Sequence, residues 1–169
     1  MATGKTTIGK RLSSRLNLPF FDSDRDIESA LGCSIKEYFR IHKESKFREI
    51  EEKIIIEKIN NNKDKHFIMS LGGGAYLNHN IRKLINLVGI SIWLNSNIDI
   101  IYNRLKNSKN ERPLMATFNT KEKLETLLKE RSLFYQKADI KVNIINTSKD
   151  TMSDLILKQI NEYINIKDA

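Results

Sequence analysis

The sequence predicts an α/β fold in which helices flank a parallel sheet. Two observations predict it. Strand-like and helix-like segments alternate along the chain, and a Gly-Lys-Thr tripeptide opens the first helix. Repeated strand–helix units are typical of parallel sheets, because a crossover helix returns the chain to the edge where the previous strand began. No Pro/Gly-rich linker or internal repeat divides the 169 residues, so we expect a single domain over 1–169.

The first half of the chain predicts four helices and two short strands. Gly32 ends the second helix, and Ser34 with Glu37 three residues later is typical of a capping box that starts the third. In the fourth helix, apolar residues recur at helical spacing before a run of asparagines ends it. The expected ranges are helices at 5–16, 25–31, from 34 and at 44–60, with strands at 19–22 and 67–71.

The second half repeats the alternation more regularly. A polar, irregular stretch at 108–119 interrupts it and contains Arg112 followed by Pro113. The expected ranges are helices at 78–86, 97–107, 120–135 and 149–164, with strands at 89–94 and 140–145.

Composition narrows the class of protein. Hydrophobic residues make up 40% and charged residues 30%, as in soluble globular proteins. No segment is long and apolar enough to span a membrane, and a single cysteine, Cys33, fits a reducing cytoplasm. The net charge of +8 comes mostly from lysines spread along the chain, so it does not indicate a nucleic-acid binder. A positive field does favour anionic ligands.

The tripeptide Gly4–Thr6 indicates a phosphate-binding loop. A helix N-terminus offers unpaired N–H groups and the positive end of its dipole to phosphate. Lys5 would bridge the β- and γ-phosphates of a nucleotide, and the Thr6 hydroxyl would bind Mg²⁺. The first glycine of the full G-x-x-x-x-G-K-[ST] pattern would lie ahead of Met1.

Two further segments follow predicted strands, at the edge where open α/β sheets bind ligands. Asp22–Asp24 offers two carboxylates, one for the water shell of Mg²⁺ and one to accept a proton from an attacking hydroxyl. Alternatively, it is a plain strand-to-helix turn with Asp24 as the N-cap. The triplet Gly72–Gly74 indicates unusual backbone angles or a close approach to a ligand, or else a tight turn.

Isolated arginines form the last candidate set. Arg48 and Arg131, on separate helices, could clamp a carboxylate bidentately, and Arg112 could close over phosphates from a mobile loop. Each is alternatively a solvated surface charge. The aromatic stripe around Phe39 and Phe47 is typical of a core, although Phe39 could wall a small-molecule pocket.

Taken together, these motifs resemble the shikimate kinase family. The resemblance covers nearly the whole chain and follows the order of the family's motifs. The matching segments are Met1–Gly9, Asp22–Asp24, Phe47–Glu51, Gly72–Ala75, Arg112–Leu114 and Arg131–Tyr135. It implies a P-loop NTPase fold with a five-stranded parallel sheet, a lid at about 107–119 and substrate-binding helices within 24–60. It also implies phosphorylation of shikimate by ATP in aromatic amino-acid biosynthesis, by a cytoplasmic monomer that binds neither nucleic acid nor membranes.

The resemblance also assigns roles to residues. Lys5, Asp24 and Arg112 would be catalytic, and Thr6 and Asp22 would hold Mg²⁺. The implied shikimate site consists of Asp24, Phe39, Phe47, Arg48, Gly72, Gly73, Gly74 and Arg131. The implied ATP site consists of Ala2, Thr3, Gly4, Lys5, Thr6, Thr7, Arg104 and Arg112.

The sequence departs from the family at its start. The family's first strand, central in its sheet, is missing from this sequence, so we expect translation to begin upstream of Met1. The alternatives are another small P-loop kinase, of the gluconate or nucleoside monophosphate type, and a non-catalytic truncated homologue. Arg48 and Arg131 together with the glycine triplet favour a small polyol that carries a carboxylate.

Overall fold

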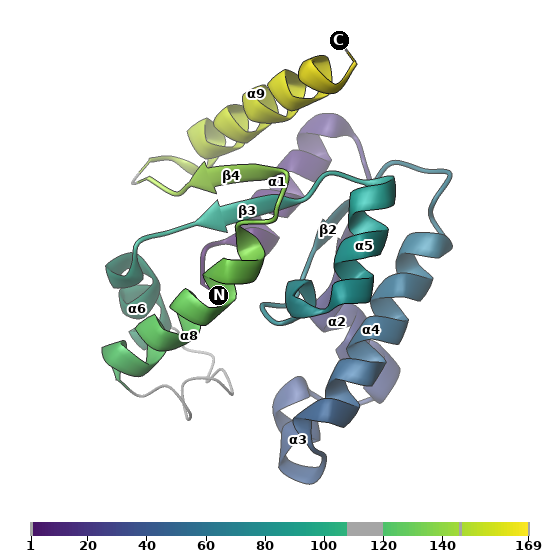
Figure 1. The fold of residues 1–169 in the computed structure, drawn as a ribbon, viewed down its shortest axis with the longest axis vertical. Coiled ribbons are helices and arrows are strands. Elements are labelled where there is room, and N and C mark those ends of the chain that lie inside the picture. The colour runs from purple at the N-terminus through teal and green to yellow at the C-terminus, as the bar shows by residue number, and fades with distance from the viewer. Residues whose placement is uncertain (1, 108–119, 146, 169) are drawn as a thin grey trace.

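The computed structural model describes residues 2–107, 120–145 and 147–168 (Figure 1). Strands and helices alternate along the chain, as expected. The elements are α1 Lys5–Leu16, β1 Phe20–Asp22, α2 Ser23–Leu31, α3 Ile35–Ile41, α4 Glu44–Asn60, β2 Ile68–Ser70, the 3₁₀ turn η1 Ala75–Leu77, α5 His79–Val88, β3 Ile92–Asn95, α6 Ile98–Lys106, α8 Lys121–Tyr135, β4 Ile140–Asn143 and α9 Lys149–Lys167.

The strands form two parallel pairs. Phe20 of β1 lies opposite Ile68 of β2, and Ile92 of β3 lies opposite Ile140 of β4. Within the described residues, no backbone ladder joins the two pairs, so a continuous five-stranded sheet is not present. The α/β class and the parallel direction of the strands are confirmed.

Several boundaries differ from the expected ones, and two of these differences arise because a helix is longer. Helix α2 begins at Ser23, so Asp24 lies in its first turn, and the alternative of Asp24 as N-cap is wrong. Helix α5 runs to Val88, where the N–H of Gly89 donates to the Ile85 carbonyl at 2.8 Å. The strand expected over 89–94 therefore starts only at Ile92. The capping box of Ser34 and Glu37 is confirmed.

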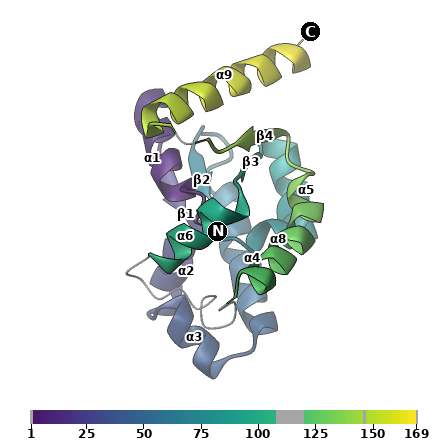
Figure 2. The same ribbon diagram turned by 90° about the vertical axis from the view of Figure 1, so that its left-hand side faces the viewer.

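Small apolar clusters join the elements. Buried side chains of α1, β4 and α9 form one cluster, which includes Ile8, Val142 and Ile156. A second cluster packs α2 and α3 on α4, which lie together at one end of the molecule (Figure 2). Two exposed ion pairs, Arg11 with Asp150 and Arg15 with Asp154, also join α1 to α9. Among the described helices, none has the length and apolarity needed to cross a bilayer.

Replacing Ile156 tests the first cluster. Ile156 is fully buried, so Ile156→Ala should lower the free energy of unfolding by about 2–5 kcal/mol, through lost burial and the cavity left behind. Urea denaturation followed by circular dichroism measures this change. Ile166→Ala on the same helix is the control, because Ile166 is 76% exposed and its replacement should change stability by less than about 0.5 kcal/mol. Equal effects would contradict the assignment of Ile156 to the core.

Candidate active site

The start of α1 has the geometry of an anion-binding loop. Gly4 occupies the N-cap position in the left-handed region, at φ 90°, and no side chain caps the helix there. Such a backbone conformation costs glycine little, whereas a side chain would strain it. Ala2, two residues earlier, also has a positive φ of 49°. The N–H groups in the first turn of α1 point to the side where an anionic ligand is favoured by the positive end of the helix dipole.

A hydroxyl and a carboxylate meet beside this loop. The Thr6 hydroxyl, in the first turn of α1, donates to Oδ2 of Asp22 at 2.8 Å, and Asp22 is the last residue of β1. Both supply hard oxygen atoms, which Mg²⁺ prefers. No cluster of three or more His, Cys, Asp or Glu side chains lies within the described ranges, so this pair alone would not enclose an ion. The pair therefore fits a Mg²⁺ ion that keeps water and phosphate oxygens as its other ligands.

A cavity of about 260 Å³ opens next to the loop. Arg104 of α6 lies at its edge, where its Nη1 donates to the Ala2 carbonyl at 3.2 Å. Described residues in the connection between β4 and α9 also line the cavity, and sequence reasoning assigned them no role. No motif marks that connection in the sequence. The lining residues are Ala2, Thr3, Gly4, Thr7, Ile8, Arg104, Ile144, Ile145, Thr147, Ser148, Lys149 and Met152.

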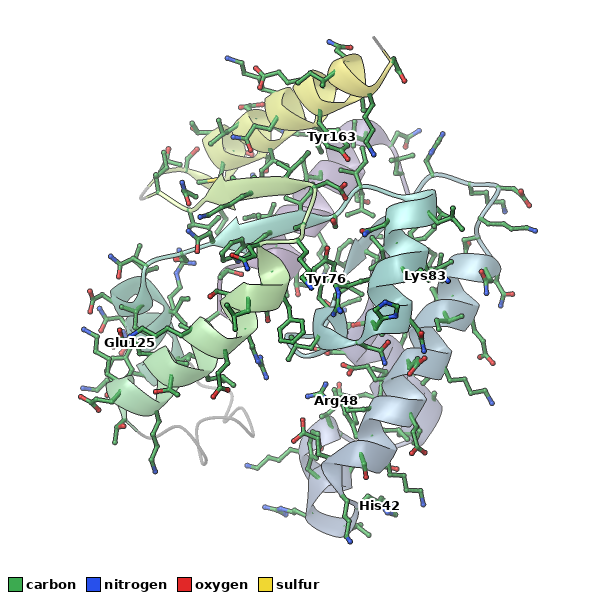
Figure 3. All side chains as sticks on the ribbon, viewed as in Figure 1. His42, Arg48, Tyr76, Lys83, Glu125 and Tyr163 are labelled. Carbon is green, nitrogen blue, oxygen red and sulfur yellow. The ribbon has the colours of Figure 1, made fainter. Side chains whose placement is uncertain are left out.

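A larger cavity, of about 450 Å³, lies between α4 and α8. Both predicted clamp arginines line it, Arg48 from α4 (labelled in Figure 3) and Arg131 from α8. The interpretation of either as a solvated surface charge therefore fails. The lining residues are Glu44, Arg48, Gly74, Leu77, Asn78, Leu127, Glu130, Arg131 and Phe134.

Arg131 is the unusual member of this cavity. The residue is only 6% exposed, and its Nε and Nη1 have no hydrogen-bond partner in the part of the chain that the structure describes. Burying an unpaired cationic donor is costly, so such groups normally have a hydrogen-bond partner. An anion entering the cavity would satisfy these N–H groups.

Arg48 is held by two glutamates. Its Nη1 donates to Oε2 of Glu51 at 2.6 Å, while its Nη2 and Nε donate to Oε1 of Glu44 at 2.8 and 3.2 Å. Burial alone would lower the pKa of Arg48, but these two carboxylates outweigh it and raise the pKa. Arg48 therefore stays charged and fixed in the cavity wall. Sequence reasoning assigned no role to either glutamate, although their i−4 and i+3 spacing from Arg48 was a usable signal.

The glycine triplet packs tightly against charged side chains. A Cβ on Gly72 would lie 2.5 Å from Oδ1 of Asp24, and one on Gly74 would lie 2.3 Å from Nη1 of Arg48. The N–H of Gly72 also donates to the Ser23 hydroxyl at 2.8 Å. None of the three has a positive φ, so close approach, not unusual backbone angles, explains Gly72 and Gly74.

Tyr135 fixes α8 to the same turn. Its hydroxyl donates to the carbonyl of Gly73, and its ring lies 6.0 Å from Trp93 and 6.4 Å from Tyr76. Burial raises the pKa of Tyr135, although the nearby charge of Arg131 opposes the rise. The phenol is therefore a neutral donor. Its hydrogen bond to Gly73 fixes the position of α8, and so of Arg131, relative to the glycine triplet. Sequence reasoning gave Tyr135 no role of its own.

The remaining predicted residues lie elsewhere. Phe47 is buried against Ile27 and Tyr38, and the centroid of its ring lies 4.7 Å from that of Phe39. Neither phenylalanine lines the 450 Å³ cavity. Arg112, together with the lid over 108–119, lies outside the described residues. The roles of these three residues stay predictions.

The pKa of Glu51 gives a test of this electrostatic arrangement. Burial raises it above the usual value, and the Asp24 carboxylate adds to the rise, while Arg48 and Arg131 oppose it. A raised folded-state pKa favours folding at low pH, and this contribution is lost as the pH rises through that pKa. The glutamine of Glu51→Gln cannot titrate, so the variant does not lose this contribution. The free energy of unfolding of the variant minus that of the unmodified chain should therefore increase as the pH rises from below 4.5.

Urea denaturation of both proteins across pH 4 to 8 measures this difference. A difference that stays constant or shrinks with rising pH would contradict a raised pKa for Glu51.

Comparisons with known proteins agree with this geometry. The model of the family described as shikimate kinase matches residues 1–164. A shikimate kinase of Bartonella quintana is 38% identical over 164 residues, which cover 97% of this chain and 76% of that protein.

Among solved structures, a shikimate kinase from Acinetobacter baumannii in complex with shikimate is 30% identical, with a TM-score of 0.87 over 96% of this chain and 89% of that one. A shikimate kinase from Bacteroides thetaiotaomicron is 26% identical, with a TM-score of 0.83 over 95% of this chain and 94% of that one. The chain belongs to the shikimate kinase family.

Proposed function

We propose that this chain transfers the γ-phosphoryl group of ATP to the 3-hydroxyl of shikimate, giving ADP and shikimate 3-phosphate. The observation that carries the proposal is the buried Arg131, whose Nε and Nη1 lack hydrogen-bond partners among the described residues, in a cavity that it shares with Arg48. Two such guanidinium groups suit a small anionic substrate that carries a carboxylate. Shikimate, the substrate in the name of the related shikimate kinases, fits this description.

On the substrate side, we assign the carboxylate to Arg48 and Arg131 and the reacting hydroxyl to Asp24. Asp24 lies at the Gly72 end of the glycine turn, in the first turn of α2, where its carboxylate can accept the hydroxyl proton during transfer. The turn itself supplies backbone polar groups to the sugar-like ring. Phe39 and Phe47 would support this wall from the cluster behind it.

On the nucleotide side, residues 2–7 would hold the phosphates and Arg104 would lie near the base in the 260 Å³ cavity. Lys5 and Arg112 would hold the transferring group. Thr6 and Asp22 would hold Mg²⁺, which when bound neutralises phosphate charge. The protein's own contribution is to position the two substrates in line and to keep water out. The monomeric state and cytoplasmic location implied by the resemblance stay predictions.

Shikimate-dependent release of ADP from ATP and Mg²⁺ tests the proposal. Asp24→Asn should lower kcat by about 10²-fold or more, because the acceptor of the hydroxyl proton is lost. Asp64→Asn, in the exposed loop after α4, is the matched control and should leave the rate unchanged. Faster turnover of gluconate or a nucleoside monophosphate than of shikimate would contradict the proposed substrate.

Gly74→Ala tests the clamp itself. The new Cβ would overlap the Arg48 guanidinium, so the arginine must move, and KM for shikimate should rise about tenfold while KM for ATP changes little. Steady-state kinetics measures both constants. Gly89→Ala is the control, because its Cβ would meet only the Ile85 carbonyl at 3.6 Å, an ordinary contact. If Gly74→Ala raised both KM values equally, the damage would be general rather than local to Arg48.

A further inference from the structure

The hydrogen bonds of Arg48 occupy one edge of its guanidinium group. Arginine has five N–H donors, and a carboxylate binds it bidentately only across two neighbouring nitrogens. Nε and Nη2 form one such edge, and both donate to a single oxygen of Glu44, Oε1. Nη1, which belongs to the other edge, donates to Glu51. The edge at Nε and Nη2 is therefore occupied by a carboxylate that belongs to the protein.

The two glutamates differ sharply in how firmly they are held. The side chain of Glu51 is 3% exposed and that of Glu44 is 68% exposed. An exposed ion pair adds little stability and can open at small cost, whereas a buried pair resists separation. Glu51 can therefore keep Arg48 oriented without Glu44, which is free to leave the arginine.

Glu44 also lies where an anionic substrate must enter. It lines the 450 Å³ cavity together with Arg48, Glu130 and Arg131. Its charge opposes that of an incoming carboxylate, and its oxygen occupies the Nε–Nη2 edge of Arg48, one of the two edges at which a carboxylate can bind bidentately. Arg131 lines the same cavity, and its Nε and Nη1 have no hydrogen-bond partner among the described residues.

We propose that Glu44 is an internal competitor for the substrate carboxylate, which must displace it from the Nε–Nη2 edge of Arg48. This inference rests on the proposed function, because it requires a substrate that carries a carboxylate. The phosphorylated product keeps the same carboxylate, so Glu44 returns to Arg48 as the product leaves. Glu44 thus sets how tightly the cavity holds both molecules.

Isothermal titration calorimetry with shikimate tests this competition on the whole chain. Glu44→Gln keeps the shape of the side chain but removes its charge and weakens its hold on Arg48. We expect the variant to bind shikimate about two- to fivefold more tightly, which is the range for loss of an exposed ion pair. Glu130→Gln is the matched control, because it removes a negative charge from the same cavity wall. No ion pair joins Glu130 to Arg48 among the described residues, so its gain should be smaller.

Binding of ADP to all three proteins shows that each is folded and separates the possible failures. If Glu44→Gln bound shikimate no better than the unmodified chain, or less well, Glu44 would be a positioning residue and the competition would be refuted. An equal gain in Glu130→Gln would also refute it, since charge alone would then explain the effect. If the unmodified chain bound ADP but not shikimate, the proposed function would itself be wrong.

Discussion

The close packing of charged side chains against the Gly72–Gly74 turn is the constraint on which the site depends. Asp24 from α2 and Arg48 from α4 approach so closely that no Cβ fits at Gly72 or Gly74. Tyr135 from α8 bonds the carbonyl between them. Three helices that are distant in the sequence are thus placed against one short turn. The separation of the two arginines follows from this packing, because each is attached to a helix that the turn locates.

In this arrangement, the burial of charged groups makes an unfavourable contribution to the free energy of folding. Arg131 is buried with two nitrogens that have no partner in the described part of the chain, and burial beside Asp24 disfavours ionisation of Glu51. Each of these features lowers the stability of the fold, as is common where a site is preorganised for a charged ligand. A bound anion would satisfy Arg131 and so stabilise the folded chain in proportion to its affinity. The groups that lower the stability of the fold are therefore the same groups that would select an anionic ligand.

Local sequence signals predicted the helices well. The features that they did not predict depend on contacts between residues that are distant in the sequence. Helices 5–16 and 44–60 were expected with the bounds that α1 and α4 have, because capping and periodicity are properties of neighbouring residues. The strand expected from residue 89 begins at Ile92, since an apolar run cannot show where a preceding helix stops. Motifs predicted Arg48 and Arg131 as a clamp, and the structure brings both to the lining of one cavity. Nothing in the sequence predicted that Tyr135 would reach Gly73, a contact across 62 positions.

The junction of β1 and α2 explains how one short segment can serve two substrates. Asp22 ends the strand in an extended conformation and meets Thr6, on the phosphate side. Asp24 follows after one residue but is already helical, and its carboxylate lies against Gly72 of the glycine turn. Because α2 starts at Ser23, the two carboxylates diverge, although only one residue separates them. Had the helix begun at residue 25, as the sequence pattern indicates, Asp24 would have capped α2 and would not have been available for a substrate hydroxyl. Under the proposed function, the early start of α2 is what leaves the Asp24 carboxylate in the first turn of the helix as the proposed proton acceptor.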